Sequence, residues 1–243
     1  MKTRYLLVML TVSVLLAVGC TKNEFIKSGV SNGRFDGSLL EYLKAPGHSY
    51  DWDSTARLVE QAGPEVVRLF EGKDPEHPEI TFLGPTNHSI RRYMLDNDIE
   101  RISDMDPDDC KELLLQCIID GKIYSNDVPR GKYDEDESMP GEGGKYYPTL
   151  SGSTVWLYTH QQTLQGIPDV GAISMGVYSQ SAFRDFPIAS SNIEPNNCVV
   201  HSLSYNFTLG DFAEMDYPDY PDDPDYPDYP DDPDYPGDDF EDF

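Results

Sequence analysis

Apolar residues in the first half of the chain follow helical spacing. The clearest segment is 106–119, DPDDCKELLLQCII, where an apolar position recurs every three or four residues and predicts one amphipathic helix. Asp106 is its expected N-cap, and Pro107 fits the first helical position. Its apolar stripe consists of Cys110, Leu113, Leu114, Cys117 and Ile118. The same spacing predicts shorter helices at 37–45, 51–63 (capped by Asp53 or Ser54), 64–72 and 87–95.

The pattern changes after Gly121, where residues typical of strands predominate. Segments rich in Val, Ile, Thr, Tyr and Trp predict strands at 122–128, 145–150, 153–159, 171–178 and 196–207, and a short one lies earlier, at 79–86. The acidic stretch 133–144 is expected to be a loop. Helices followed by strands, without a repeated strand–helix–strand order, indicate an α+β fold. No linker-like composition interrupts residues 35–212, which we interpret as one domain.

The N-terminus resembles a bacterial lipoprotein signal. Lys2 and Arg4 precede an apolar run that is too short for a spanning helix and ends at Cys20. We expect residues 1–19 to be removed, Cys20 to be acylated as a membrane anchor, and 20–34 to form a tether. An ordinary secretion signal with an incidental cysteine is the alternative. The expected location is the outer membrane, with the domain at the cell surface or on the periplasmic face.

The C-terminal segment 213–243 is strongly acidic and repetitive. Residues 216–233 are the unit DYPDYPDDP written twice, and residues 216–243 hold twelve Asp and one Glu, half of the net charge of −26. With only Tyr and Pro as apolar residues the repeat cannot form a core, so we expect a disordered, extended tail. So acidic a surface excludes nucleic acid as a partner. In a polyproline II geometry the carboxylates of the first column would stand about 9 Å apart, too far to chelate one calcium ion.

Residues that carry chemistry show no catalytic or metal-binding pattern. Apart from Cys20 the cysteines are Cys110, Cys117 and Cys198; a bridge from Cys198 to either of the others is possible, but three buried thiols are favoured. Cys110 and Cys117 on one helix would lie about 10.5 Å apart, too far for a disulfide. The five histidines have no zinc-type spacing. We therefore expect no enzyme activity and no cofactor.

Four segments in order resemble the fasciclin domain, an extracellular adhesion module. They are ITFLGPTNHSI (80–90), LLLQCIIDGKIYSNDV (113–128), TLSGSTVWL (149–157) and NNCVVHSLSYNF (196–207). We call the first and the last of them the two boxes. The middle segment departs from the family, because Gln116-Cys117 stands where many members have Tyr-His. An integrin-like partner therefore does not carry over. In the last segment, Asn197-Cys198 replaces the usual Asn-Gly.

The resemblance implies an α+β fold in which a wedge of two β-layers has a helical side. It also implies no cofactor and no catalytic residue. The candidate binding residues of the two boxes are Thr81, Phe82, Pro85, Thr86, Asn87, Asn197, Val199, Val200 and His201. The expected function is a cell-envelope lipoprotein that presents this domain to an extracellular protein or glycan. An accessory lipoprotein that captures substrate for a glycan uptake system is the alternative; Trp52 and Trp156 would stack on sugars there, although core packing is favoured for both.

Overall fold

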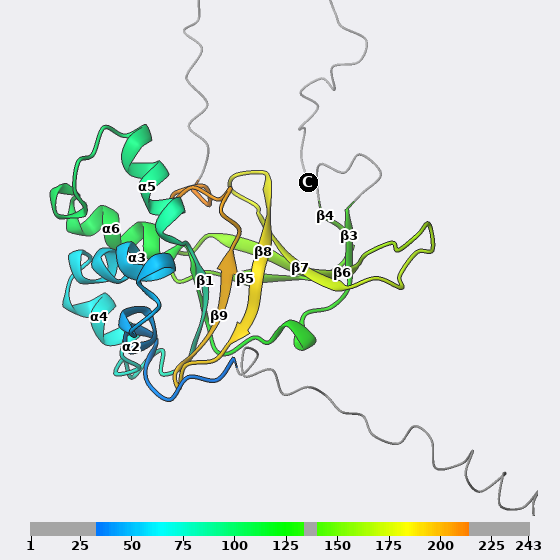
Figure 1. Cartoon of the computed structure of the whole chain (residues 1–243), viewed down its shortest axis with the longest axis horizontal. Coiled ribbons are helices and arrows are strands. Elements are labelled where there is room, and N and C mark those ends of the chain that lie inside the picture. The colour runs from blue at the N-terminus through cyan, green and yellow to red at the C-terminus, as the bar shows by residue number, and fades with distance from the viewer. Residues whose placement is uncertain (1–32, 134–139, 214–243) are drawn as a thin grey trace, which may run out of the picture.

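A computed structural model describes residues 33–133 and 140–213 of the chain (Figure 1). The helices are α2 (Leu39–Lys44), α3 (Ser49–Gln61), α4 (Pro64–Phe70), α5 (Asn87–Asp96) and α6 (Pro107–Leu115), with short 3₁₀ turns η1 (Ile102–Asp104) and η2 (Ser125–Asp127). The strands are β1 (Ile80–Gly84), β2 (Ile118–Asp120), β3 (Gly131–Tyr133), β4 (Pro140–Gly143), β5 (Lys145–Pro148), β6 (Thr154–Gln161), β7 (Ile173–Ser179), β8 (Arg184–Ile193) and β9 (Cys198–Leu203). The fold class is α+β, as the sequence predicts.

Seven strands form one sheet in the order β2-β1-β9-β8-β7-β6-β5. Neighbours are antiparallel except β1 and β9, which run parallel. The two edge strands, β2 and β5, approach each other. Ile119 of β2 forms an isolated β-bridge with Thr149, which follows β5, and the Leu150 N–H donates to the Ile118 carbonyl (2.8 Å). The two layers expected from the sequence are therefore two halves of one bent sheet.

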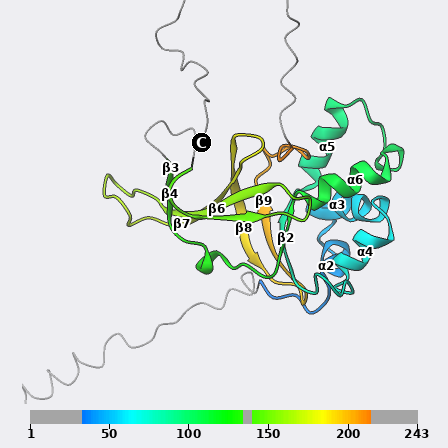
Figure 2. The same cartoon turned by 180° about the vertical axis from the view of Figure 1, so that it is seen from behind.

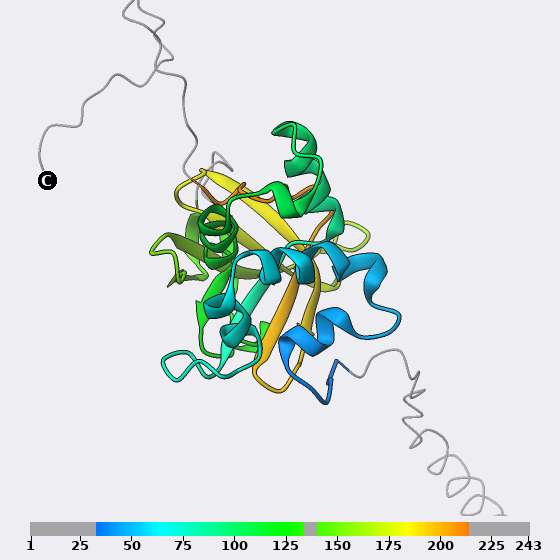
Figure 3. The same ribbon diagram turned by 90° about the vertical axis from the view of Figure 1, so that its left-hand side faces the viewer.

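The helices gather on one side of the sheet and cover it (Figures 1 and 3). Helix α3 is the centre of this layer, since it packs against α2, α4, α5 and α6. Apolar side chains of helices and strands form one continuous core, in which Phe70 of α4 meets Phe82 of β1 edge to face, with ring centroids 5.1 Å apart. The core continues past β9, where Phe207 and Phe212 pack against Phe186 of β8.

A smaller aromatic cluster lies apart from the main core and is formed by Trp156, Tyr158 and Tyr178. The two-stranded ribbon β3–β4 adjoins it: the Trp156 indole N–H donates to the Gly143 carbonyl (3.1 Å). Gly144 adopts φ +57°, and a Cβ there would stand 2.2 Å from the Trp156 ring. Glycine therefore permits both the turn and the close approach of the backbone to the indole.

Several local predictions are confirmed. Helix α6 begins as expected, because the Asp108 N–H donates to the Asp106 carboxylate (2.8 Å) and Pro107 occupies the first turn. Trp52 and Trp156 are core residues, exposed by 4% and 0%. Cys110, Cys117 and Cys198 are buried free thiols, so neither possible bridge from Cys198 forms.

Other local predictions are wrong. Helix α3 begins at Ser49, and its N-cap is His48, five or six residues before the expected caps Asp53 and Ser54. Helix α6 ends at Leu115, so Cys110 and Cys117 do not share a helix and Ile118 belongs to a strand. The predicted strand at 122–128 is irregular and contains a 3₁₀ turn. Strand β8, absent from the prediction, is the longest of the described strands, and β4 lies within the expected acidic loop.

The expected anchor at Cys20, the expected signal at 1–19, most of the expected tether and the acidic repeat at 216–233 lie outside the described residues. So does the DEDE run at 134–137. Within the described ranges, none of the helices has the length and apolarity that crossing a bilayer requires. The first described residues (blue) and the last (orange) lie at opposite ends of the sheet, as Figures 1 and 3 show.

Candidate functional site

The two boxes, more than a hundred residues apart in the sequence, lie side by side in the structure. β1 pairs with β9 in parallel register from Ile80 opposite Cys198 to Gly84 opposite Ser202. Both are inner strands of the sheet, so their side chains alternate between the helical layer and the other half of the bent sheet. The box residues meet there, in the middle of the domain.

Most of the candidate binding residues face the interior. Seven are buried: Thr81, Phe82, Pro85, Asn197, Val199, Val200 and His201. The Thr81 hydroxyl donates to the Gly121 carbonyl (2.7 Å) and accepts from the Ile123 N–H (2.8 Å), so it fixes the chain after β2. Thr86 and Asn87 are only partly buried, and they are the two candidate binding residues that reach the surface.

His201 is fully buried, and its Nε2 lies 2.8 Å from the Ile123 carbonyl. Nε2 therefore carries the proton and donates, while buried Nδ1 has no hydrogen-bond partner among the described residues. Burial lowers the pKa of the imidazole, and the bond to Ile123 opposes this only in part. His201 is thus a neutral core residue with no access to a ligand.

The two candidate asparagines, Asn197 and Asn87, hold helices in place. The Asn197 side-chain oxygen accepts from the Leu39 N–H (2.8 Å) at the start of α2, and its amide donates to the carbonyls of Leu69 and Phe70 (both 3.3 Å) at the end of α4. One side chain therefore caps two helices that lie far from it in sequence.

Asn87 acts in the same way on α3. Its amide donates to the carbonyls of Ser49 and Tyr50 (both 2.8 Å), and its oxygen accepts from the Ser54 N–H (2.7 Å). All of its hydrogens, and one of its acceptor positions, are used inside the domain.

Two surface grooves include a box residue. The groove beside Asn87 has a volume of about 660 Å³ and lies between α3, α5 and η1. Its charged lining is balanced, since three arginines (Arg57, Arg91 and Arg101) accompany Asp53, Glu60 and Glu100. Arg57 already pairs with Asp53 (3.0 Å). Asn87 is occupied as well, and no aromatic side chain lines this groove.

The second groove, which we call the Thr86 groove, lies where α2, α3 and the start of α5 meet β8 and β9. Its volume is about 400 Å³. Its lining comprises Tyr42, Asp51, Trp52, Thr86, His88, Ala189, Ser190, Ile193, Ser202, Leu203 and Tyr205. Aromatic and aliphatic walls with a few polar groups are typical of sites for small ligands. The groove is therefore the stronger candidate site.

Each aromatic wall of the Thr86 groove is positioned differently. Tyr205 is 75% exposed, so its ring presents a free face to solvent. Trp52 is buried, and its ring packs so closely on Gly84 that a Cβ there would stand 2.8 Å from it. Tyr42 is half-buried between Trp52 and His48, and burial raises the pKa of its phenol. Tyr205 is the ring most accessible to a ligand.

The polar groups of the groove suit hydrogen bonding to hydroxyl or amide groups. Asp51 and His88 are exposed at its edge, and Ser190 and Ser202 line its β-side. The Thr86 hydroxyl oxygen is shielded from solvent and has no partner in the described part of the chain. The buried thiols lie elsewhere, and burial raises the pKa of Cys110 to about 11 and those of Cys117 and Cys198 further still. These thiols stay protonated near neutral pH and are poor nucleophiles.

Among residues 33–133 and 140–213, no three His, Cys, Asp or Glu side chains are grouped so that they would hold a metal ion. The exposed polar and aromatic groove residues that the sequence did not single out are Asp51, His88, Ser190 and Tyr205. They come from four different elements or loops, and no spacing in the sequence links them. The available signals were the positions of His88 in the segment 80–90 and of Tyr205 in the segment 196–207, after the last strand.

No protein-family model matches the chain, and no curated protein sequence matches it. Among solved structures, the chain is similar to a FAS1 domain pair from the insect cell adhesion molecule fasciclin I. The two are 12% identical, with a TM-score of 0.43, and the match covers 63% of this chain and 43% of that chain. It thus spans less than half the length of the insect structure.

Proposed function

We propose that this chain is a cell-envelope lipoprotein that presents its domain to an extracellular protein or glycan and binds it in the Thr86 groove. The observation that carries the proposal is the groove itself. It lies where a box reaches the surface, and it combines an exposed ring with exposed carboxylate, imidazole and hydroxyl groups. The lipoprotein-type N-terminus and the four fasciclin-like segments support the same role.

The groove suits a ligand that has both apolar faces and hydroxyl or amide groups. The ring of Tyr205 offers an apolar face for a sugar ring or a side chain, and its hydroxyl stays hydrated at the edge. Asp51 accepts hydrogen bonds, while Ser190 donates or accepts them. Among the described residues, no hydrogen bond joins a hydroxyl of the lining to His88 or Asp51, as it would join a nucleophile to its base. Reversible binding, without a chemical step, is therefore the activity that we propose.

A screen of the protein against glycan and extracellular-protein arrays tests the proposal. Tyr205→Ala should weaken the strongest interaction by about 30-fold, the loss expected for a central aromatic contact worth about 2 kcal/mol. Tyr50→Ala is the matched control, because Tyr50 is 77% exposed but does not line the groove. Equal affinities of the two variants would exclude the groove, and no binding by the unsubstituted protein would count against the function.

The same groove also supports the alternative, capture of substrate for a glycan uptake system. A gene neighbourhood that encodes a glycan transporter would favour capture, whereas neighbouring adhesin or matrix genes would favour adhesion. Protease treatment of intact cells tests the proposed location. Loss of the domain indicates surface display, and its survival in intact but not in lysed cells places it on the periplasmic face.

A further inference from the structure

The hairpin of β6 and β7 extends well beyond the rest of the sheet. Its connection, residues 162–173 including the first residue of β7, is called the arm. Figures 1 and 2 show the arm projecting from the side of the molecule opposite the helices. None of the grooves that carry box residues includes it. The proposed ligand site therefore leaves the arm unexplained.

The arm is an ordered hairpin held by its own hydrogen bonds. Leu164 and Ile167 exchange two backbone bonds of 3.0 Å, and Gln165 and Gly166 between them have φ of +51° and +80°. Positive φ at both central residues is the feature of a type I′ turn. Closer to the body, the Gln162 N–H donates to the Ala172 carbonyl (2.9 Å).

The ordered hairpin exposes four aliphatic side chains to solvent. Leu164, Ile167, Val170 and Ile173 are exposed by 56%, 59%, 50% and 61%. They make up four of the five large aliphatic residues that are prominently exposed in the described part of the chain, the other being Leu95. As cross-strand partners, Leu164 and Ile167 project from the same face of the hairpin. So dense an aliphatic cluster on an ordered tip marks a contact surface.

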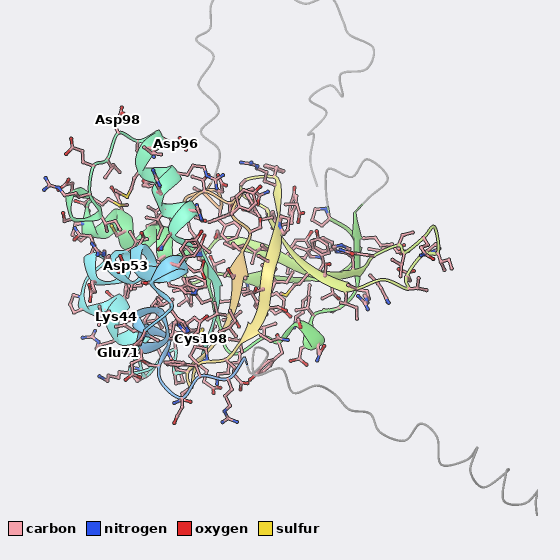
Figure 4. All side chains as sticks on the ribbon, in the orientation of Figure 1. Lys44, Asp53, Glu71, Asp96, Asp98 and Cys198 are labelled. Atoms are coloured by element: carbon pink, nitrogen blue, oxygen red, sulfur yellow. The ribbon has the colours of Figure 1, made fainter. Side chains whose placement is uncertain are left out.

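Charge is distributed unequally between the two sides of the molecule. Residues 33–130 contain eleven basic and twenty acidic side chains and residues 131–144 one basic and five acidic, whereas residues 145–193, which include the arm, contain two of each. Figure 4 shows Asp53, Asp96 and Asp98 on the helical side, away from the arm. The one charge of the arm, Asp169, lines a recess at its base together with Arg130, Lys132 and Glu142, so the two signs are balanced there. An anionic surface therefore repels the arm less than it repels the helical side.

We propose that the arm inserts its tip into the interfacial region of a lipid bilayer, as a second contact beside the proposed lipid anchor, on which this inference rests. From Gln162 to Gln165 the arm rises about 10 Å, which is the depth to which interfacial segments bury their apolar side. Paired backbone groups lower the cost of entering apolar surroundings. The chain from Cys20 to Gly33 spans at most about 45 Å when extended, so the domain stays within reach of the membrane.

Depth-dependent fluorescence quenching tests this contact in the full-length protein, reconstituted into vesicles of phosphatidylethanolamine and phosphatidylglycerol. An environment-sensitive dye is attached to Ile167→Cys in the arm or to Asp96→Cys, an exposed position on the helical side. The three cysteines of the domain are at most 1% exposed and do not compete for the dye. The unsubstituted protein, treated alike, gives the background from Cys20. Flotation of the protein with the vesicles is measured first, as a separate test of the lipid anchor.

Lipids brominated in the acyl chain should quench most of the emission at Ile167→Cys and leave that at Asp96→Cys unchanged. Adding Leu164→Gln to the Ile167→Cys protein should restore the emission. Protein that floats without quenching at the arm overturns the inference and leaves the anchor standing; protein that does not float overturns both. Crosslinking of the unquenched arm to another protein in cells would assign the tip to a protein partner instead. None of these readouts depends on the Thr86 groove.

Discussion

The double cap formed by Asn197 gives the most direct test of how the helical layer is fixed to the sheet. Asn197→Ala removes the acceptor of the Leu39 N–H and the donor to the carbonyls of Leu69 and Phe70. Leu39 is fully buried, so its N–H loses its partner without gaining water. An unsatisfied buried donor costs about 1–3 kcal/mol, and the two longer bonds add less.

We therefore expect the free energy of unfolding to fall by about 2–4 kcal/mol, which lowers the Tm by roughly 5–15 °C for a domain of this size. Urea denaturation followed by tryptophan fluorescence measures the first quantity and calorimetry the second. Asn196→Ala is the matched control, because Asn196 is the exposed neighbour and its amide makes one long bond to Asp36 (3.4 Å). If the two variants are equally stable, Asn197 does not hold the helices and the reasoning is wrong.

Two further predictions concern the core. Burial lowers the pKa of His201. Below pH 6.5, the ordinary pKa of histidine, the unfolded chain therefore binds a proton that the folded domain does not bind. The stabilising effect of the neutral imidazole is complete above pH 6.5 and is lost as the pH falls towards the folded pKa. Urea titrations from pH 7.5 down to 5 should show this loss in the unsubstituted protein but less of it in His201→Phe, and parallel pH profiles would contradict it. Gly144→Ala should destabilise the domain by more than Gly152→Ala, by about 1–3 kcal/mol, since both glycines have positive φ but only a Cβ at Gly144 would meet the Trp156 ring. If the two variants lower the Tm equally, the Trp156 ring moves away from the added methyl group at little cost.

The sequence predicted elements best where polar groups mark their ends. Pro64, Asp106 and Pro107 fixed the starts of α4 and α6 correctly. The end of α6 could not be placed, because Cys117, Ile118 and Ile119 are all buried and a continuous apolar run is compatible with a helix or an inner strand. The structure resolves this by turning the chain after Leu115 so that Ile118 can pair with β1.

Strand β8 was missed for a different reason. Half of its sequence, RDFPIASSNI, is polar and it contains Pro187, features that argue against a strand inside a sheet. The pairing of β8 with β7 on one side and β9 on the other overrides this local preference. Its ladder with β9 is irregular, with register shifts between Ile188 and Ile193, and no sequence pattern indicates such shifts.

The candidate site was predictable only as a neighbourhood. The resemblance of the two boxes to fasciclin segments drew attention to β1 and β9, which the structure pairs. It did not indicate which way the side chains point, and Thr81, Asn197 and His201 turn inward to bond backbone groups. The exposed residues of the Thr86 groove come together through the packing of helices on the sheet, and that packing depends on contacts far apart in the sequence.

The position of β9 also determines when this domain can fold. β9 is the last strand in the sequence, yet it lies between β1 and β8. Until residues 198–203 are available, β1 has only the short β2 beside it and the sheet remains in two parts. Closing so long a loop is slow. We therefore expect a chain still emerging from the ribosome to remain unfolded until nearly the whole domain has been made, a state that suits passage across a membrane before folding.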